Sequence, residues 1–223
     1  MEKMKKFYDT DYYVSNARRH VIKFGDARVR KIYDFVEGDK ILDIGCGDGT
    51  ISAHLLGRNK EVAGVDISKK AIVTARKRGI DACVCNVESQ DLPFKSHYFD
   101  CVIAGEIIEH LFDTDAFIDK CKRVLKKNGV LIITVPNCAS LRARISLLLG
   151  RQPAWVEYRA EGGAGHIRAY TLKALVRQLE EHKFKVEGAR ANVVKIPFIG
   201  SFSVLGDLFP SFGDGLVVKA RSK

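Results

Sequence analysis

The sequence lacks several patterns that would identify common classes of protein. None of its six cysteines forms a CxxC pair, which argues against a zinc ribbon or a redox motif. No apolar run is long enough to span a bilayer. The charged opening segment MEKMKKFYDTDYY has no apolar stretch of the kind found in signal peptides. We therefore expect a protein of the reducing cytoplasm.

Two phosphate-binding fingerprints are also missing. The stretch Ile41–Thr50 reads ILDIGCGDGT. A G-x-G-x-x-G fingerprint that starts at Gly45 would need its third glycine at Thr50, and the Lys-Ser/Thr pair of a Walker loop is absent. The pattern that is present is D-x-G-x-G-x-G, from Asp43 to Gly49. An acidic residue before such a loop would repel a pyrophosphate, and it suits a ligand with an ammonium or sulfonium group.

Composition allows one sizeable domain. The chain has 223 residues, of which 46% are hydrophobic and 29% are charged, as in ordinary globular proteins. The net charge of +10 is explained most simply by a lysine-rich solvated surface. An anionic partner, such as a nucleic acid, a membrane surface or an acidic substrate, stays open as the alternative.

The middle of the chain alternates strand-like and helix-like segments. Strands are expected at Lys40–Ile44, Glu61–Val65, Asp81–Cys85, Phe99–Ala104 and Val130–Val135. Helices are expected at Lys69–Arg78 and Asp115–Lys127; Asn128 and Gly129 would stop the second, and Lys126 and Lys127 would lie at its carboxyl end. This order predicts a parallel sheet with helices on both faces.

The remaining segments suggest four parts of one domain. Residues 1–38 would form a helical cover, 39–135 a ligand-binding core, 136–170 a lid or substrate insertion, and 171–223 a C-terminal helix and strands. Further elements are expected as follows: a helix at Leu141–Leu149, a helix at Thr171–His182, a strand at Lys183–Arg190, an apolar loop at Val193–Phe212 and a last strand at Leu216–Arg221.

Polar residues follow two further strands of this core. Asp66 ends the second strand, where a carboxylate can accept hydrogen bonds from both hydroxyls of a ribose. Asn86 ends the third strand, where its amide can bond an adenine edge beside the Val87 backbone N–H. Three consecutive strand ends would then bind an amino acid, a ribose and a base. S-adenosylmethionine contains all three groups.

With these features, the sequence resembles the class I S-adenosylmethionine-dependent methyltransferases that act on small molecules. The resemblance covers about residues 39–137 and, more weakly, HIRAYT at 166–171. It rests on ILDIGCGDGT, GVDIS, NVESQDLPF, FDCVIAGEIIEH and LKKNGVLIITVPN, in that order. It implies a Rossmann-like, seven-stranded, mostly parallel sheet with an antiparallel last strand. Asn86 is a departure, because the family usually has Asp there.

The resemblance implies a set of cofactor-binding residues. These are Asp43, Gly45, Cys46, Gly47, Gly49, Asp66, Ile67, Asn86, Val87 and Glu106. Structural alternatives stay open for several of them. The glycine loop could be a turn that binds nothing, Asp66 could only cap a helix, and Asn86 could only form a turn.

Glu106, His110 and His166 are the candidate catalytic residues. A hydroxyl acceptor needs a base, and either histidine could act as one. The segment EIIEH is similar to the E-x-x-E-H segment of quinone-biosynthesis O-methyltransferases, where it is linked to a divalent metal. Glu106, Glu109 and His110 could hold such an ion. Structural bracing and acid–base work by His110 are the alternatives that we favour, so we assign no metal site.

Other reactions are disfavoured. Methyltransferases that act on exocyclic amines usually carry an N/D-P-P-Y/F motif after the fourth strand, where this chain reads AGEI. A cytosine-C5 enzyme needs a nucleophilic cysteine beside proline, and Asn137 separates Cys138 from the nearest proline. A nucleic-acid substrate is therefore unlikely on sequence grounds, and no added RNA-binding module is visible.

Two apolar segments, Leu141–Trp155 and Val193–Phe212, suggest a second hypothesis. Together they could line a greasy acceptor pocket or lie on a membrane surface, as for a prenylated substrate. The simpler interpretation is a helix packed on the sheet and a dimer or lid contact. A further group could close over the methionine end of the cofactor or be ordinary surface: Tyr8, Tyr12, Tyr13, Arg18 and Arg19.

Taken together, these patterns predict an S-adenosylmethionine-dependent methyltransferase that acts on a small molecule, at an oxygen. The alternatives are a metal-dependent O-methyltransferase of a prenylated quinone precursor, an RNA methyltransferase, and a cofactor-binding regulator without turnover. A monomer and a homodimer are both compatible with the sequence, as is peripheral contact with a membrane.

Overall fold

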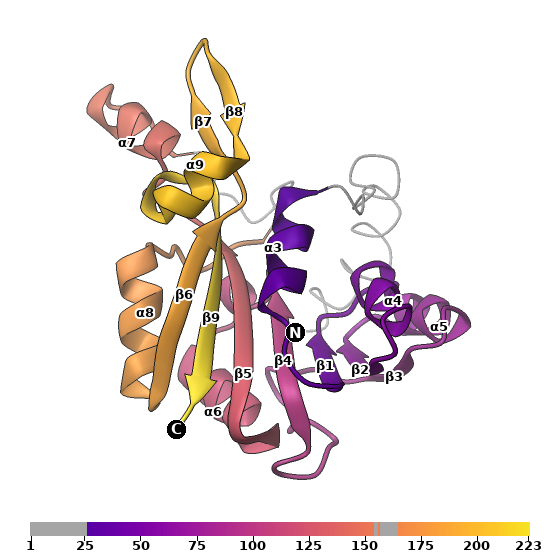
Figure 1. Ribbon diagram of the computed structural model, residues 1–223. Helices are drawn as coiled ribbons and strands as arrows, with labels where there is room; N and C mark the ends of the chain where they lie inside the picture. Colours follow the sequence, from indigo (N-terminus) through magenta and orange to yellow (C-terminus); the bar gives the residue numbers. More distant parts are fainter. Residues whose placement is uncertain (1–25, 154–155, 157–164) are drawn as a thin grey trace.

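The computed structural model describes residues 26–153, 156 and 165–223 (Figure 1). Some sequence predictions lie outside these ranges: residues 1–25 of the predicted helical cover, with Tyr8, Tyr12, Tyr13, Arg18 and Arg19, and residues 154–155 and 157–164 of the predicted insertion, with Trp155. Within the ranges, no helix has both the length and the apolar character needed to cross a membrane.

One seven-stranded sheet forms the centre of the molecule. Its strands are β1 (Lys40–Ile44), β2 (Glu61–Asp66), β3 (Asp81–Val84), β4 (Phe99–Gly105), β5 (Leu125–Pro136), β6 (Phe184–Ala191) and β9 (Gly215–Ser222). Their order is β3-β2-β1-β4-β5-β9-β6. The first five strands pair in parallel, and β9 runs antiparallel to both β5 and β6. The predicted mostly parallel sheet with an antiparallel last strand is confirmed.

Helices connect the strands and cover both faces of the sheet. The α-helices are α3 (Ala27–Phe35), α4 (Thr50–Leu56), α5 (Lys69–Lys77), α6 (Thr114–Val124), α7 (Leu141–Leu148), α8 (Leu172–Glu181) and α9 (Ser203–Leu208); two 3₁₀ turns are η2 (Ile108–His110) and η3 (Pro210–Phe212). Polar side chains cap the starts of five helices by accepting a backbone N–H: Asp26, Ser68, Asp113, Ser140 and Thr171.

Strand β5 shows why both faces need cover. Leu131 and Ile133 belong to one buried cluster, which α6 and α8 complete. Val130 and Ile132 belong to a second cluster, which α3, α4 and α5 complete. Neighbouring residues of a strand point to opposite faces, so an unbroken apolar run must be covered twice. Burying each such side chain contributes about 1.5–3 kcal/mol.

The predicted end of the helix before β5 was wrong. Helix α6 ends at Val124, and its last turn carries Lys122 and Arg123 rather than Lys126 and Lys127. Leu125 is buried, adopts extended backbone angles and pairs with Phe99, so the chain has already entered β5.

The segment predicted as an apolar loop at 193–212 was also wrong, because it contains ordered elements. It forms the antiparallel hairpin of β7 (Val194–Ile196) and β8 (Gly200–Phe202), followed by α9 and η3. Figure 1 shows this hairpin, α7 and α9 standing above the upper edge of the sheet. The strands β7 and β8 are three residues each, too short for an alternation of polar and apolar residues to predict them.

Candidate active site

The candidate site lies at the carboxyl edge of the parallel strands. Ile44 pairs with Val65 and with Ala104, and Asp66 pairs with Val84, so β1, β2, β3 and β4 end at nearly the same level. Asp66 is the last residue of β2, and the segments that follow β1, β3 and β4 contain the glycine loop, Asn86 and Glu106. Sheets of this kind bind ligands at this edge.

The glycine loop turns tightly between β1 and α4. The amides of Gly45 and Cys46 both donate to the Val65 carbonyl, at 2.8 and 3.1 Å. Gly45, Gly47 and Gly49 have φ values of +73°, +55° and +79°, a region that favours glycine. Burial raises the pKa of the Cys46 thiol, so this residue presents backbone rather than a reactive thiolate.

Asp43 lies on β1, two residues before Gly45. Its carboxylate is 4% exposed and accepts a hydrogen bond from the Ser52 hydroxyl on α4. Burial raises the pKa of Asp43 to about 7, against the opposing effect of the Ser52 hydrogen bond. The pair ties β1 to α4. Ser52 was not among the residues singled out from the sequence, because its contact depends on how α4 packs.

Asp66 connects the glycine loop to the next helix. Its Oδ2 atom accepts from the Gly47 amide at 2.9 Å, and its Oδ1 atom accepts from the Ser68 amide at 2.8 Å. The side chain is buried at the end of β2, and the neighbouring Ile67 is half-buried. The carboxylate is thus fixed at the level of the loop.

Asn86 forms a turn after β3. Its Oδ1 atom accepts from the Glu88 backbone amide at 3.1 Å, and its backbone amide donates to the Gln90 side-chain oxygen at 2.8 Å. The Val87 carbonyl accepts from Lys120 at 2.8 Å. The turn role that the sequence left open is therefore present, whether or not the residue also contacts a ligand.

Glu106 follows β4 in a strained conformation. Its φ is +56°, which is uncommon for a residue other than glycine and is typical of functional sites. Its Oε1 atom accepts from the Thr134 hydroxyl at 2.8 Å and lies 3.2 Å from Arg28 Nη1. Sequence reasoning did not identify Arg28 or Thr134, since both come from distant parts of the chain.

Glu109, His110 and His166 form a compact cluster beside Glu106. The Glu109 Oε1 atom lies 3.9 Å from Nε2 of each histidine, and the two rings are 5.0 Å apart. His110 Nδ1 lies 3.1 Å from the Gly165 carbonyl. The Glu109 carbonyl accepts from the amides of Ile167 and Arg168, which holds this segment against η2.

Glu109 has a demanding environment. Its side chain is 1% exposed, and within the described residues neither carboxylate oxygen has a hydrogen-bond partner. Burial raises its pKa well above the usual range, and the nearby Glu106 carboxylate adds to this shift. A buried carboxyl in this position is stabilised by a proton or by a cation.

One potential ligand atom from each of Glu109, His110 and His166 lies within 4.8 Å of the others, which is close enough to surround an ion. Carboxylate oxygen and neutral imidazole nitrogen are ligands for divalent transition metals. The sequence had suggested Glu106, Glu109 and His110 for such a site. The structure instead groups His166 with Glu109 and His110, while Glu106 pairs with Arg28.

Comparison with known proteins now adds to this geometry. Residues 42–133 match a family model described as a methyltransferase domain. The chain is 31% identical over 138 residues to the ubiquinone biosynthesis O-methyltransferase of Pelagibacter ubique, covering 60% of this chain and 56% of that protein. The chain thus spans about half the length of this curated relative.

Solved structures share the fold at low identity. A methyltransferase of Thermotoga maritima, described as S-adenosylmethionine-dependent and a possible histamine N-methyltransferase, has a TM-score of 0.74 at 18% identity and covers 100% of this chain and 99% of its own. The cyclase SpnF has a TM-score of 0.63 at 17% identity, covering 88% of this chain and 81% of its own. The predicted family resemblance and Rossmann-like fold are confirmed.

Proposed function

We propose that this chain transfers the methyl group of S-adenosylmethionine to an oxygen of a small-molecule acceptor, because residues 42–133 match a methyltransferase-domain family model and the fold is that of S-adenosylmethionine-dependent methyltransferases. The observation that carries the proposal is the alignment of three strand ends, at the glycine loop, Asp66 and Asn86, beside the Glu109 cluster.

The residues at the strand ends suit the three parts of the cofactor. The glycine loop offers backbone groups to the methionine part, because no side chain projects from Gly45 or Gly47. The fixed Asp66 carboxylate is placed to accept from ribose hydroxyls. Asn86 and Val87 border the adenine position. When bound, S-adenosylmethionine supplies an electrophilic methyl group; the protein must orient the acceptor and exclude water.

The residues after β4 would act on the acceptor. His110 and His166 lie side by side, and either imidazole can accept the proton of an acceptor hydroxyl. The Glu109 Oε1 atom lies 3.9 Å from Nε2 of each ring, and it would stabilise the imidazolium that forms once the carboxyl itself is ionised. Glu106 is held by Arg28 and Thr134, and we assign it to the methionine part of the cofactor.

Oxygen is favoured over nitrogen as the accepting atom for a chemical reason. A hydroxyl is a weak nucleophile unless a nearby base takes its proton as the methyl group is transferred, whereas a neutral amine is nucleophilic enough to react first and lose its proton afterwards. The Glu109 cluster supplies candidate bases. The name of the Pelagibacter relative also indicates O-methylation, whereas that of the Thermotoga neighbour indicates an amine.

Calorimetric titration of S-adenosylmethionine and S-adenosylhomocysteine tests the cofactor half. We expect micromolar binding to the wild type and its loss in Asp66→Ala. Asp81→Ala, which changes an exposed carboxylate at the opposite end of β3, is the matched control and should bind normally. Binding of NAD or ATP instead of these two ligands would overturn the assignment.

An acceptor screen tests the catalytic half. Phenols, catechols and primary amines are incubated with labelled cofactor, and labelled product is counted. We expect transfer to a hydroxyl compound that His166→Gln or His110→Gln lowers at least tenfold, with little change in cofactor affinity. Tight cofactor binding without transfer to any acceptor would favour the alternative of a cofactor-binding regulator. This fold also occurs in SpnF, a protein named as a cyclase, so the fold alone does not establish methyl transfer.

A divalent metal ion is a second candidate component of this site. It is favoured by the buried Glu109 carboxylate and by the short separations among Glu109, His110 and His166. The ion would satisfy the carboxylate and polarise an acceptor hydroxyl. Thermal denaturation after chelation tests this without any assay of activity. Added Mn²⁺ or Zn²⁺ should raise the wild-type Tm, the rise should disappear in His166→Gln, and His54→Gln should behave as wild type. Equal shifts in both variants would contradict the metal site.

A further inference from the structure

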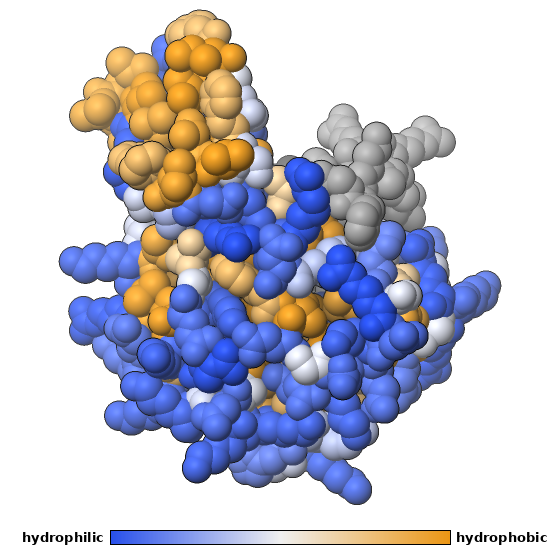
Figure 2. Space-filling view, viewed as in Figure 1, coloured by the Kyte–Doolittle hydropathy of each residue, from blue (hydrophilic) through white to orange (hydrophobic). Residues whose placement is uncertain are grey.

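An apolar projection stands at the carboxyl edge of the sheet. We define it as residues 141–151 and 194–212, which comprise α7, the β7–β8 hairpin, α9 and η3. Figure 2 shows its orange surface standing clear of a largely blue body. Of the fourteen large apolar side chains that are exposed among the described residues, nine belong to this projection. An apolar surface concentrated in this way marks an interaction site.

The tip of the hairpin is the extreme case. Its turn reads PFIG at residues 197–200, and the Phe198 side chain is fully exposed. Phe198 also has a φ of +64°, where a bulky residue is strained and where glycine or asparagine would be favoured. Folding alone gives no reason to place phenylalanine there, because its ring contacts solvent rather than a core. The strain and the exposure together suggest a role outside the folded body.

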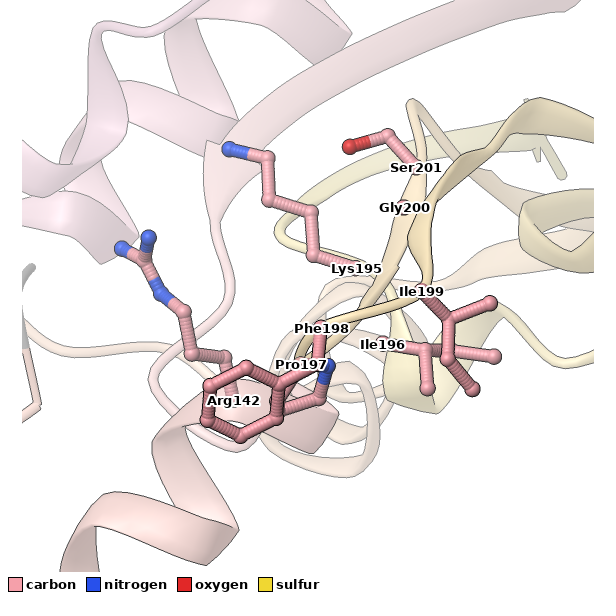
Figure 3. Close-up of a pocket in the computed structure, with 8 residues that line it drawn as sticks. All are labelled: Arg142, Lys195, Ile196, Pro197, Phe198, Ile199, Gly200 and Ser201. Carbon is pink, nitrogen blue, oxygen red and sulfur yellow. The ribbon is translucent and has the colours of Figure 1, made fainter.

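The charges of the projection are almost all positive. Its sequence contains Arg142, Arg144, Arg151 and Lys195, against the single acid Asp207. Asp207 pairs with Lys31 of the body at 2.9 Å, which offsets its charge. A hollow beside the hairpin is lined by the basic residues Arg142 and Lys195 and by the apolar residues Ile196, Phe198 and Ile199 (Figure 3). Lys195 pairs with Asp214 of the body at 3.0 Å, so the arginines supply the positive charge that accompanies the apolar tip.

We infer that this projection docks on an anionic lipid surface, with Phe198, Ile199 and the exposed leucines of α7 in the interface and the arginines at the headgroups. An apolar tip with flanking basic residues matches the two components of interfacial binding. A second copy of the chain would bring the same positive charges together, which opposes self-association through this face. The inference does not depend on the proposed methyl transfer.

Vesicle sedimentation with the full chain tests the inference. One set of vesicles contains phosphatidylcholine alone, and the other contains phosphatidylcholine with phosphatidylglycerol. We expect the wild type to sediment with the anionic vesicles, to be released by high salt, and to stay largely in solution with the neutral ones. Absence of binding to both kinds of vesicle would overturn the inference.

Two variants locate the surface. Phe198→Ser with Ile199→Ser should lower binding to anionic vesicles by about tenfold or more, since two apolar side chains leave the interface. Arg142→Glu should lower it severalfold. The matched controls are Val73→Ser and Lys70→Glu, which change exposed residues of the same types on α5. Undiminished binding by the projection variants would contradict the assignment.

Sedimentation velocity tests whether the projection binds a second copy of the chain instead of a lipid surface. The inference would be overturned if the wild type were a dimer, if the double variant Phe198→Ser with Ile199→Ser were a monomer, and if both bound vesicles equally. The face would then be assigned to self-association. All substitutions lie at exposed positions, so circular dichroism should show unchanged thermal unfolding.

Discussion

The side chain of Ile107 lies directly against the backbone of Gly45: a Cβ atom added to Gly45 would lie 2.2 Å from the Ile107 Cδ1 atom. Gly45 begins the glycine loop after β1, and Ile107 precedes the turn that contains Glu109. This contact joins the loop that we assign to the cofactor with the turn that we assign to the acceptor. Since no side chain fits between them, the spacing of the two halves of the site depends on glycine.

Gly45→Ala should therefore lower both stability and cofactor affinity. The substitution combines the cost of a positive φ with displacement of Ile107, about 1–3 kcal/mol in the free energy of unfolding. Gly150→Ala is the matched control, because Gly150 also has a positive φ, of +66°, but has open space around it. That control should lose only about 1 kcal/mol in urea unfolding and keep its affinity. Equal losses in both variants would show that the contact with Ile107 is unimportant.

The buried Asp43 predicts a pH dependence of cofactor binding. Burial raises its pKa to about 7, so the carboxylate gains a proton as the pH falls through that value. The ionised form favours a cationic ligand, so affinity for S-adenosylmethionine should fall by up to about tenfold for each pH unit below the pKa. Asp43→Asn should bind more weakly and should lack this dependence. Calorimetry across the range checks both, and a flat wild-type profile would contradict the role.

Lys31 predicts a large loss of stability on substitution. Its ammonium group donates to the carbonyls of Ala191 and Ser203, at 2.5 and 2.8 Å, and pairs with Asp207. Lys31→Met would leave these acceptors without their buried donor, at a cost of about 2–3 kcal/mol. Lys173→Met changes an exposed lysine on α8 and should cost less than about 0.5 kcal/mol. Urea denaturation measures both, and similar values would refute a structural role for Lys31.

His182 should stabilise the protein only at low pH. It joins α8 to α6, with Nδ1 2.7 Å from Asp119 and Nε2 3.1 Å from Asp115. Burial lowers the pKa of the ring, but the hydrogen bonds with Asp119 and Asp115 outweigh this and raise it overall. A raised pKa means that the contribution is fully present below the unfolded value of 6.5 and is lost as the pH rises through the folded value.

His182→Gln should accordingly lower the Tm by about 2 °C in mildly acidic buffer, with the difference disappearing in alkaline buffer. Thermal unfolding followed by circular dichroism at several pH values gives the comparison. His54→Gln, an exposed histidine on α4, should show no such trend. A difference that grows with pH would reverse the assigned sign.

Much of the fold follows from local patterns in the sequence. Strand β1 and the Val130–Val135 part of β5 are apolar runs, and serine or aspartate caps precede α5 and α6, so the positions of these strands and the starts of these helices could be predicted closely. The end of α6 could not, because Leu125 gains more from pairing with Phe99 than from another helical turn. The hairpin at 194–202 also lacked a signal, since its turn residues PFIG are not those that usually connect two strands.

The candidate site divides in the same way. The glycine loop, Asp66 and Asn86 are close to strands in the sequence, so pattern alone located them. The contacts of the residues after β4 could not be predicted in this way, because their partners are distant in the chain. Arg28 contacts Glu106 from α3, and His166 contacts Glu109 from beyond α7. Such contacts depend on the packing of complete elements, and no spacing in a single sequence encodes them.

The position of β9 has a consequence for how the protein folds during its synthesis on the ribosome. β9 pairs with β5 and β6, although both strands precede it in the chain. Until residue 222 has emerged, the apolar part of β5 from Val130 to Pro136 has one edge without its native neighbour. Such an edge can pair with another unfinished chain. The interval before β9 inserts is therefore the stage at which synthesis at high rates would most readily yield aggregates, and at which a chaperone that covers β5 would raise the yield.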